Sequence, residues 1–335
     1  MGERGATSGA CWLALTALLA LAGCASRDIP QTAAASPQSM PIVDPPMPRA
    51  APPVGSSQEL SAFYAGVQGE LTASGRMRVD TNPADMPFTV DDLVRNFERI
   101  AMMDEYVSVG GRYIHAETPA LLRRWNRPVR VGVVVGPSVP PADAAQDRRN
   151  VADFTARLAR LTGLDMRVSD GPDVNFLVMV LSSDEQSVAA QVTSRQFPGF
   201  HPAVLDQIAN TPLDTFCTAY AFAEPAAPST YAAVMILIRA EHPPFTRASC
   251  VHEEMAQAMG LPNDSPDARP SLFNTNLEFA FLTDHDEILL RMLYDPRLRP
   301  GMSAAEARPL LPAIARDAMA AEAASQARTT AAAGL

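Results

Sequence analysis

Lysine is absent from all 335 residues, and aromatic residues make up only 6% of them. Arginine therefore supplies the basic side chains, and the balance of Lys+Arg 27 against Asp+Glu 37 leaves a formal net charge of −10. Proteins that bind nucleic acid neutralise its phosphates with clusters of basic residues. This acidic sequence contains no lysine-rich run. Nucleic acid is therefore not an expected partner.

Common catalytic signatures are missing as well. The sequence has no GxSxG, no phosphate-binding P-loop and no dinucleotide fingerprint. The histidines His115, His201, His242 and His285 are scattered, which is typical of surface or core residues. Nothing in these absences excludes a hydrolase, but any active site has to be built from another set of residues.

Long apolar runs are scarce, and the longest lies at the beginning of the chain. Trp12 to Ala22 is too short to cross a bilayer as a lasting helix, and it leads into Leu21-Ala22-Gly23-Cys24. This is the pattern of a bacterial lipobox. It predicts a signal peptide over residues 1–23 and a lipid on Cys24, which anchors the protein in the cell envelope facing the periplasm. Ala25 and Ser26 favour the outer membrane over the inner one.

The remaining chain divides into three parts by composition. Residues 24–58 are rich in Pro, Ala and Ser, which predicts an extended tether without a core. Residues 59–302 are long enough for one sizeable domain. Residues 303–335 are rich in alanine and predict a helix near Ala304 to Met319 followed by a frayed end.

The cysteines agree with an envelope location. Cys11 leaves with the predicted signal and Cys24 carries the lipid, so Cys217 and Cys250 remain as a pair in an oxidising compartment. We expect them to form a disulfide. The alternative is that Cys250 is a nucleophile served by His252, but no sequence signature supports it.

Hydrophobic periodicity predicts a mixed α/β domain. Thr283 and Asp286 form a capping-box pattern for a helix through Tyr294, which Asp295-Pro296 ends. Helices are also expected over Val94–Met103 and Ala142–Leu161, and strands over Val129–Val135, Val174–Leu181 and Tyr231–Ile238.

One helix carries a spacing that metal sites use. Glu253 and Gln257 are four residues apart and share one helix face, Gly260 and its following proline end the helix, and Asn263 can return toward the same face. A register that starts at His252 lacks a partner on that face. The same residues also fit an ordinary helix C-terminus with a solvated i,i+4 pair.

Two longer runs carry a resemblance to a known family. CVHEEMAQAMGLPND and the downstream LTDHDEILLRMLYDPRLRPGM resemble the DUF2927 family of proteobacterial lipoproteins, over about Phe88 to Met302. More distantly, EExxQxxGLxND is similar to the HExxHxxGxxH pattern of metzincin peptidases. That similarity implies a zincin-like mixed sheet with a long motif helix, and an edge strand beside a peptide cleft. Tyr231–Ile238 directly precedes the helix.

Carried over by position, Glu254 corresponds to the general base of the peptidases. Glu253, Gln257 and Asn263 correspond to the three histidine ligands, and Met302 to the methionine of the turn below the metal. Zinc in peptidases is held by imidazoles that leave it able to activate water, whereas amide oxygens are hard donors that suit calcium or magnesium. An oxygen shell for such an ion could draw on residues of the following loop: Asp264, Asp267, Asn274, Asn276 and Glu278.

Two hypotheses follow from this departure. The first is a domain without zinc that binds a peptide or an envelope partner in a remnant peptidase cleft. The alternative is a metal-dependent hydrolase that uses Glu254 as its base, with an atypical oxygen-rich site or with His252 or His285 brought in from elsewhere.

Overall fold

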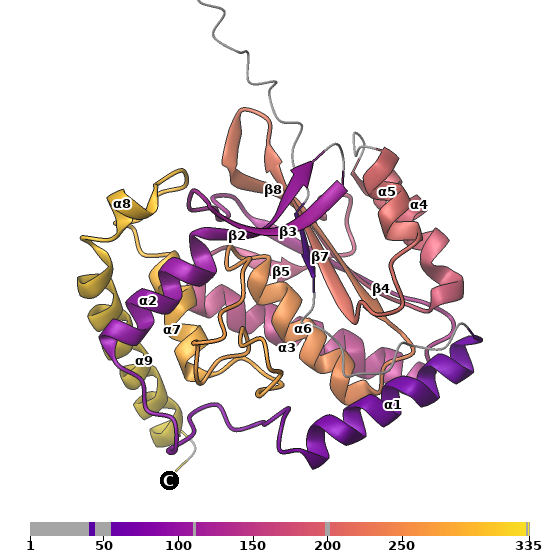
Figure 1. Cartoon of the computed structure of the whole chain (residues 1–335), viewed down its shortest axis with the longest axis horizontal. Coiled ribbons are helices and arrows are strands. Elements are labelled where there is room, and N and C mark those ends of the chain that lie inside the picture. Colours follow the sequence, from indigo (N-terminus) through magenta and orange to yellow (C-terminus); the bar gives the residue numbers. More distant parts are fainter. Residues whose placement is uncertain (1–39, 44–54, 110–111, 198–201, 333, 335) are drawn as a thin grey trace, which may run out of the picture. The chain divides into compact units, whose positions relative to one another are not determined.

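The computed structural model describes residues 40–43, 55–109, 112–197, 202–332 and 334 (Figure 1). These residues belong to one compact unit, Ser36–Leu335. The predicted signal peptide, Cys24 and most of the predicted tether lie outside the described residues. Within the described part of the chain, no helix is both long enough and apolar enough to span a membrane.

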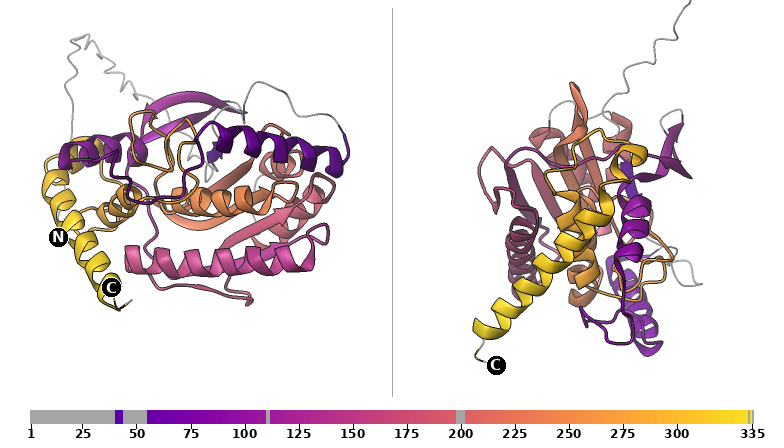
Figure 2. Two further views of the ribbon diagram at one scale, coloured as in Figure 1. Left: turned by 90° about the horizontal axis from the view of Figure 1, so that it is seen from below. Right: turned by 90° about the vertical axis from the view of Figure 1, so that its left-hand side faces the viewer.

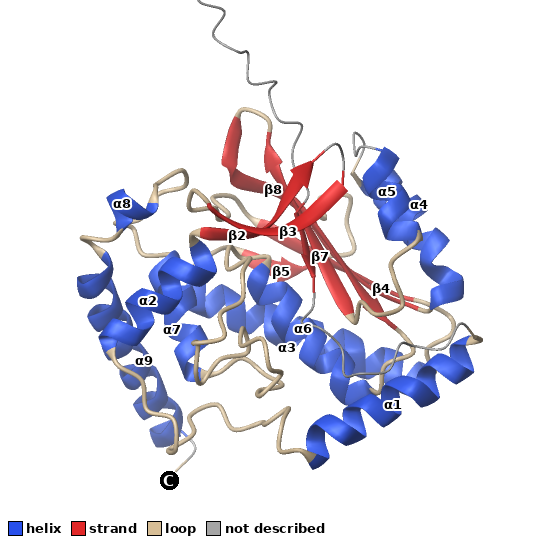
Figure 3. Cartoon of the chain, in the orientation of Figure 1, coloured by secondary structure: helices blue, strands red, loops and turns tan. Residues whose placement is uncertain are grey.

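A six-stranded mixed sheet forms the centre of this unit, in the order β1-β7-β8-β6-β4-β5 (Figure 3). Neighbours from β8 to β5 run parallel, β7 is antiparallel to β8, and β1 is antiparallel to β7. The predicted α/β class is therefore confirmed. The strands are β1 Met40–Val43, β4 Val129–Val135, β5 Met166–Val168, β6 Phe176–Leu181, β7 Cys217–Glu224 and β8 Ala227–Arg239. A separate antiparallel pair is formed by β2 Met103–Val109 and β3 Arg112–Pro119.

The central strands are apolar on both faces because both faces of the sheet are covered. All six residues of β6 are buried, and they alternate between two hydrophobic clusters. Phe176, Val178 and Val180 pack in the cluster that contains the apolar residues of α3 and α6. Leu177 and its alternating neighbours pack in the cluster of α4 and α5. Each such side chain stabilises the fold by about 1.5–3 kcal/mol.

The helices cover this sheet and extend beyond it. α9, yellow in Figures 1 and 2, packs against α2 and α7. Capping boxes start several helices, including the predicted one in which Thr283 and Asp286 cap α7. The helices are α1 Ser57–Ala73, α2 Val90–Ala101, α3 Pro141–Thr162, α4 Gln186–Gln196, α5 Pro202–Ala209, α6 Pro244–Gln257, α7 Asp284–Leu293, α8 Ala304–Ala307 and α9 Leu311–Ala332, with a 3-10 turn at Ser183–Glu185.

Three differences from the sequence-based expectations concern element boundaries and neighbours. The C-terminal helix is divided into α8 and α9, because Pro309 between them lacks the N–H that a continuous helix requires, and α9 continues to Ala332 where a frayed end after Met319 was expected. The range predicted as tether contains β1, and α1 already begins at Ser57. The strand before the motif helix is not an edge strand, since β8 lies between β7 and β6.

Candidate functional site

The motif helix α6 lies in the interior of the unit. It contacts α3 and the strands β7 and β8, and ten of its fourteen residues are buried. Glu253 is 5% exposed, Glu254 1% and Gln257 3%. A general base must reach a substrate or a water molecule. The burial of Glu254 separates its carboxylate from bulk solvent, which does not suit that role.

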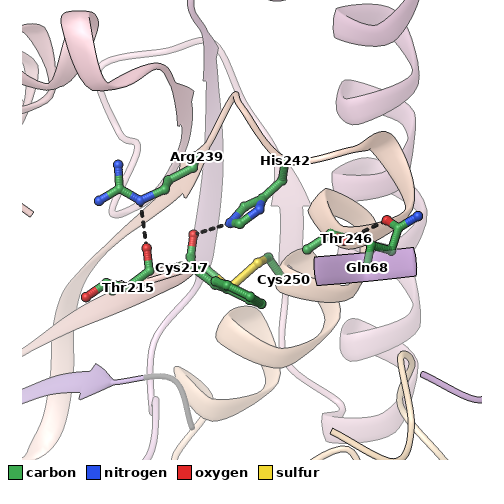
Figure 4. Close-up of a disulfide and its surroundings, with 8 residues drawn as sticks. Gln68, Thr215, Cys217, Arg239, His242, Thr246 and Cys250 are labelled. Carbon is green, nitrogen blue, oxygen red and sulfur yellow. Dashed lines mark hydrogen bonds between the residues drawn. A yellow bond between two sulfur atoms is a disulfide. The ribbon is translucent and has the colours of Figure 1, made fainter. Parts of the chain in front are cut away.

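A disulfide joins this helix to the sheet (Figure 4). Cys217, the first residue of β7, is bonded to Cys250 in the middle of α6, with their Cα atoms 6.0 Å apart. The predicted pairing is confirmed. The alternative role of Cys250 as a nucleophile is wrong for this state, because its sulfur is consumed in the bond. Thr246 of α6 also donates a hydrogen bond to the Gln68 side chain of α1 at 2.7 Å.

The turn after α6 requires a glycine. Gly260 has φ +123°, and a Cβ at this position would lie 2.1 Å from the carbonyl oxygen of Arg123. The neighbouring carbonyls are satisfied by aromatic side chains: Trp125 Nε1 donates to Ala258 at 3.0 Å, and the Tyr294 hydroxyl donates to Met259 at 2.9 Å. The Gly260 predicted to end the helix therefore also permits close packing against the preceding chain.

The side chains at two of the three peptidase ligand positions, Gln257 and Asn263, donate hydrogen bonds within the protein. Gln257 donates its amide N–H to Asp264 at 3.3 Å. The Asn263 amide nitrogen donates to the carbonyl oxygen of Arg99 at 3.0 Å and to Glu117 Oε1 at 3.3 Å. Asn263 is thereby held against α2 and β3.

This arrangement does not fit a peptidase zinc site. No imidazole stands at any of the three positions, and two of them present amide groups whose nitrogens donate hydrogen bonds to the protein. Among the described residues, no group of three or more His, Cys, Asp and Glu side chains is placed to hold a metal ion. Whether the motif binds any metal in solution stays a prediction to be measured.

The residues considered for an oxygen shell instead organise the loop between α6 and α7. The Asn274 amide donates to the carbonyls of Pro266 and Ala268 at 3.1 and 2.8 Å. Glu278 forms an ion pair with Arg269 at 2.7 Å. Asp286, predicted only as a cap, also accepts from the Ser271 hydroxyl and the Leu272 N–H.

The histidines near the motif have structural partners. His252 stacks on Phe154 with ring centroids 4.1 Å apart, and its Nδ1 accepts a hydrogen bond from the Leu282 N–H. Burial lowers the pKa of His252 to about 3, so it is neutral at physiological pH. His285 is fully buried, with its Nε2 3.0 Å from the Asn96 amide. The hydrogen bonds of both rings are therefore made to groups other than Gln257.

The remaining predicted residues occupy other parts of the chain. Burial also lowers the pKa of His242 to about 3, and its Nε2 donates to the Phe216 carbonyl at 3.0 Å. Met302 is buried, and its carbonyl accepts from the Leu122 N–H at 2.9 Å. His115 lies on β3, and His201 lies outside the described residues.

Comparison with known proteins places these observations in a family. The family model described as "Protein of unknown function (DUF2927)" matches residues 90–313, more than half of the chain. The chain belongs to the DUF2927 family. No curated protein matches it, and no solved structure matches it. The DUF2927 match includes the motif helix and the loop after it, whereas a relation to metzincins receives no support from these comparisons.

Sequence reasoning overlooked two surface regions. One is an open pocket of about 330 Å³ beside the loop after the motif, lined by Arg95, Asn96, Glu98, Arg99, Met103, Ser265 and Asp267. The other is a pocket of about 490 Å³ lined by residues of α3, α7 and α9. Arg157 and Arg160 of the second pocket are three residues apart on a predicted helix, but no local signal indicates that α9 meets them.

Proposed function

We propose that this member of the DUF2927 family is a lipid-anchored protein of the cell envelope whose domain binds an extended peptide segment of an envelope partner, without zinc catalysis. The binding position in this proposal is the outer edge of β7. The observation that carries it is the pairing of β7 with β1, a short segment of the chain's own N-terminal region.

The β1 pairing supports strand addition at this edge. Met40, Pro41, Ile42 and Val43 lie opposite Ala221, Tyr220, Ala219 and Thr218 in antiparallel register. Pairing of this kind uses main-chain groups, so an edge that accepts one extended segment can accept another with a different sequence. A partner peptide would replace Met40–Val43 and pair with the same strand.

The motif helix supports the absence of peptidase chemistry. Its polar side chains are buried, and the amides of Gln257 and Asn263 donate hydrogen bonds to neighbouring elements. The proposed peptide position is therefore not the motif helix, where the sequence suggested a cleft. It is the outer edge of β7, the strand that the disulfide joins to α6.

The test releases β1 and asks whether the edge accepts a peptide. Only alternate residues of an edge strand donate their backbone N–H to the neighbouring strand. Ile42→Pro and Val43→Pro are therefore made separately, because one of the two must remove such a donor from β1. The probe is a synthetic peptide with the sequence of residues 38–45. Amide hydrogen exchange of Cys217–Glu224 reports whether it binds.

We expect the β7 amides to exchange faster in the effective proline variant and to regain protection when the peptide is added. The peptide should bind the effective proline variant about ten-fold more tightly than the unaltered chain, in which β1 occupies the edge of β7. Ala50→Pro in the proline-rich segment is the matched control and should leave β7 unchanged. Equal exchange in all variants, or no protection by the peptide, would contradict the proposal.

A further inference from the structure

Three helices that are distant in sequence form a pocket rich in arginine. Its volume of about 490 Å³ lies within the range of small-molecule sites. The wall consists of Arg157, Arg160 and Leu161 of α3, Glu287 and Arg291 of α7, and Glu322, Ser325, Gln326, Arg328 and Thr330 of α9. Four arginines against two glutamates leave an excess of two positive charges in a chain whose net charge is −10.

Two of the arginines are held in place by the two glutamates. Arg157 Nε lies 2.5 Å from Glu287 Oε1, and Arg291 Nε lies 2.9 Å from Glu322 Oε2. Burial raises the pKa of Glu287, against the opposing effect of Arg157. These ion pairs join α3 to α7 and α7 to α9, so they set the shape of the pocket.

The other two arginines are available to a ligand. Arg160 and Arg328 are exposed, and neither forms an ion pair or a side-chain hydrogen bond with another described residue. The Gln326 amide, which donates to Asp284 at 2.5 Å and to Glu322 at 3.3 Å, lies on the same wall. The two guanidinium groups therefore provide the uncompensated charge of the pocket.

We propose that this pocket binds a ligand through a doubly charged phosphate group, which Arg160 and Arg328 contact. Guanidinium groups present paired N–H donors whose spacing matches phosphate oxygens, and such charge-assisted bonds are stronger than neutral ones. A dianion neutralises the excess charge of the wall, whereas a monocarboxylate neutralises half of it. The phosphate can belong to a soluble metabolite or to a lipid headgroup.

Calorimetric titration of the full chain with inorganic phosphate and with glycerol 3-phosphate tests the site. We expect saturable binding that weakens at least ten-fold in R160A/R328A. The control is R76A/R167A, which removes two exposed arginines outside the pocket and the same total charge. Arg157 and Arg291 are left unchanged because their ion pairs hold the helices together.

The source of the phosphate is decided with vesicles. Phosphatidic acid in phosphatidylcholine vesicles is compared with phosphatidylcholine alone, using the Cys24→Ala chain so that no acyl anchor contributes. Binding that R160A/R328A abolishes and R76A/R167A preserves supports the site, with a lipid source if only the vesicles bind. Equal loss in both double variants, equal binding of succinate, or no binding of any phosphate probe overturns the proposal.

Discussion

The motif helix and the arginine pocket use polar residues in opposite ways. On α6, Glu253, Glu254 and Gln257 are buried, although their spacing suggests a catalytic site. In the pocket between α3, α7 and α9, Arg160 and Arg328 belong to no motif and are exposed. The residues with motif-like spacing therefore lie in the core. Arg160 and Arg328, which form no ion pair with another described residue, lie in the pocket, and no sequence motif marks them.

The physical cost of burial explains the difference. A buried polar group loses its contacts with water, and hydrogen bonds within the protein offset that loss. Near α6 the amide nitrogens of Gln257 and Asn263 donate to Asp264 and to the Arg99 carbonyl, whereas the amide oxygen of Gln257 has no hydrogen-bond partner among the described residues. An exposed arginine pays no such cost and stays free for a ligand. Variants in the two regions test whether α6 is structural and whether the pocket tolerates substitution better.

Among the substitutions, the largest effect is expected from removing the disulfide at α6. The bond closes a loop with a sequence separation of 33, which corresponds to about 3–4 kcal/mol in the chain-entropy model. The C217A/C250A variant should lose this stability in a urea unfolding experiment. R160A/R328A serves as the comparison and should change the free energy of unfolding by less than about 0.5 kcal/mol. A larger loss in the arginine variant would break the distinction between the two regions.

Gly260→Ala should be nearly as destabilising, by about 3 kcal/mol. The added Cβ meets the Arg123 carbonyl at 2.1 Å, and the φ of +123° is unfavourable for alanine. Gly75→Ala is the matched control, because its φ is +77° but no atom lies within 4 Å of the added Cβ. It should cost about 1 kcal/mol. Similar costs for the two variants would show that the close approach after α6 is unimportant.

Acid should destabilise the protein through its buried histidines. The pKa values of His242 and His252 are lowered from 6.5 to about 3 by burial, so the unfolded chain binds more protons between these values. Stability should therefore fall as pH decreases from about 6.5 toward 3, by up to about 1.4 kcal/mol per pH unit for each histidine. His242→Phe should make this slope shallower in urea unfolding at a series of pH values. An unchanged slope would contradict the assignment.

The smallest effect is expected for metal content. We predict less than about 0.1 equivalent of zinc in protein purified from its native envelope, because no imidazole occupies the three ligand positions. Glu254→Gln should leave the metal content unchanged, and elemental analysis measures both. One equivalent of zinc, lost with a hydrolytic activity in Glu254→Gln, would establish the enzyme hypothesis and overturn the structural interpretation of α6.

Local patterns predicted much of the secondary structure. Val129–Val135 is a strand with the expected bounds, and the Thr283 and Asp286 capping box starts α7 as expected. Helix α2 begins four residues earlier than predicted, at Val90, because Thr89 caps it. The candidate site was predicted less well: the direction in which the Asn263 amide points depends on α2 and β3, which its own segment does not reveal.

The sequence by itself determined several of the helices and strands, the family and the cysteine pairing, because caps, apolar runs and the number of cysteines are properties of short segments or of composition. Only the tertiary structure decided that β8 is internal, that β1 covers β7, that α6 is buried and that four arginines share one pocket. These features arise where segments far apart in the chain pack together. Their formation depends on the order of strands and on the burial of whole faces, which no local pattern specifies.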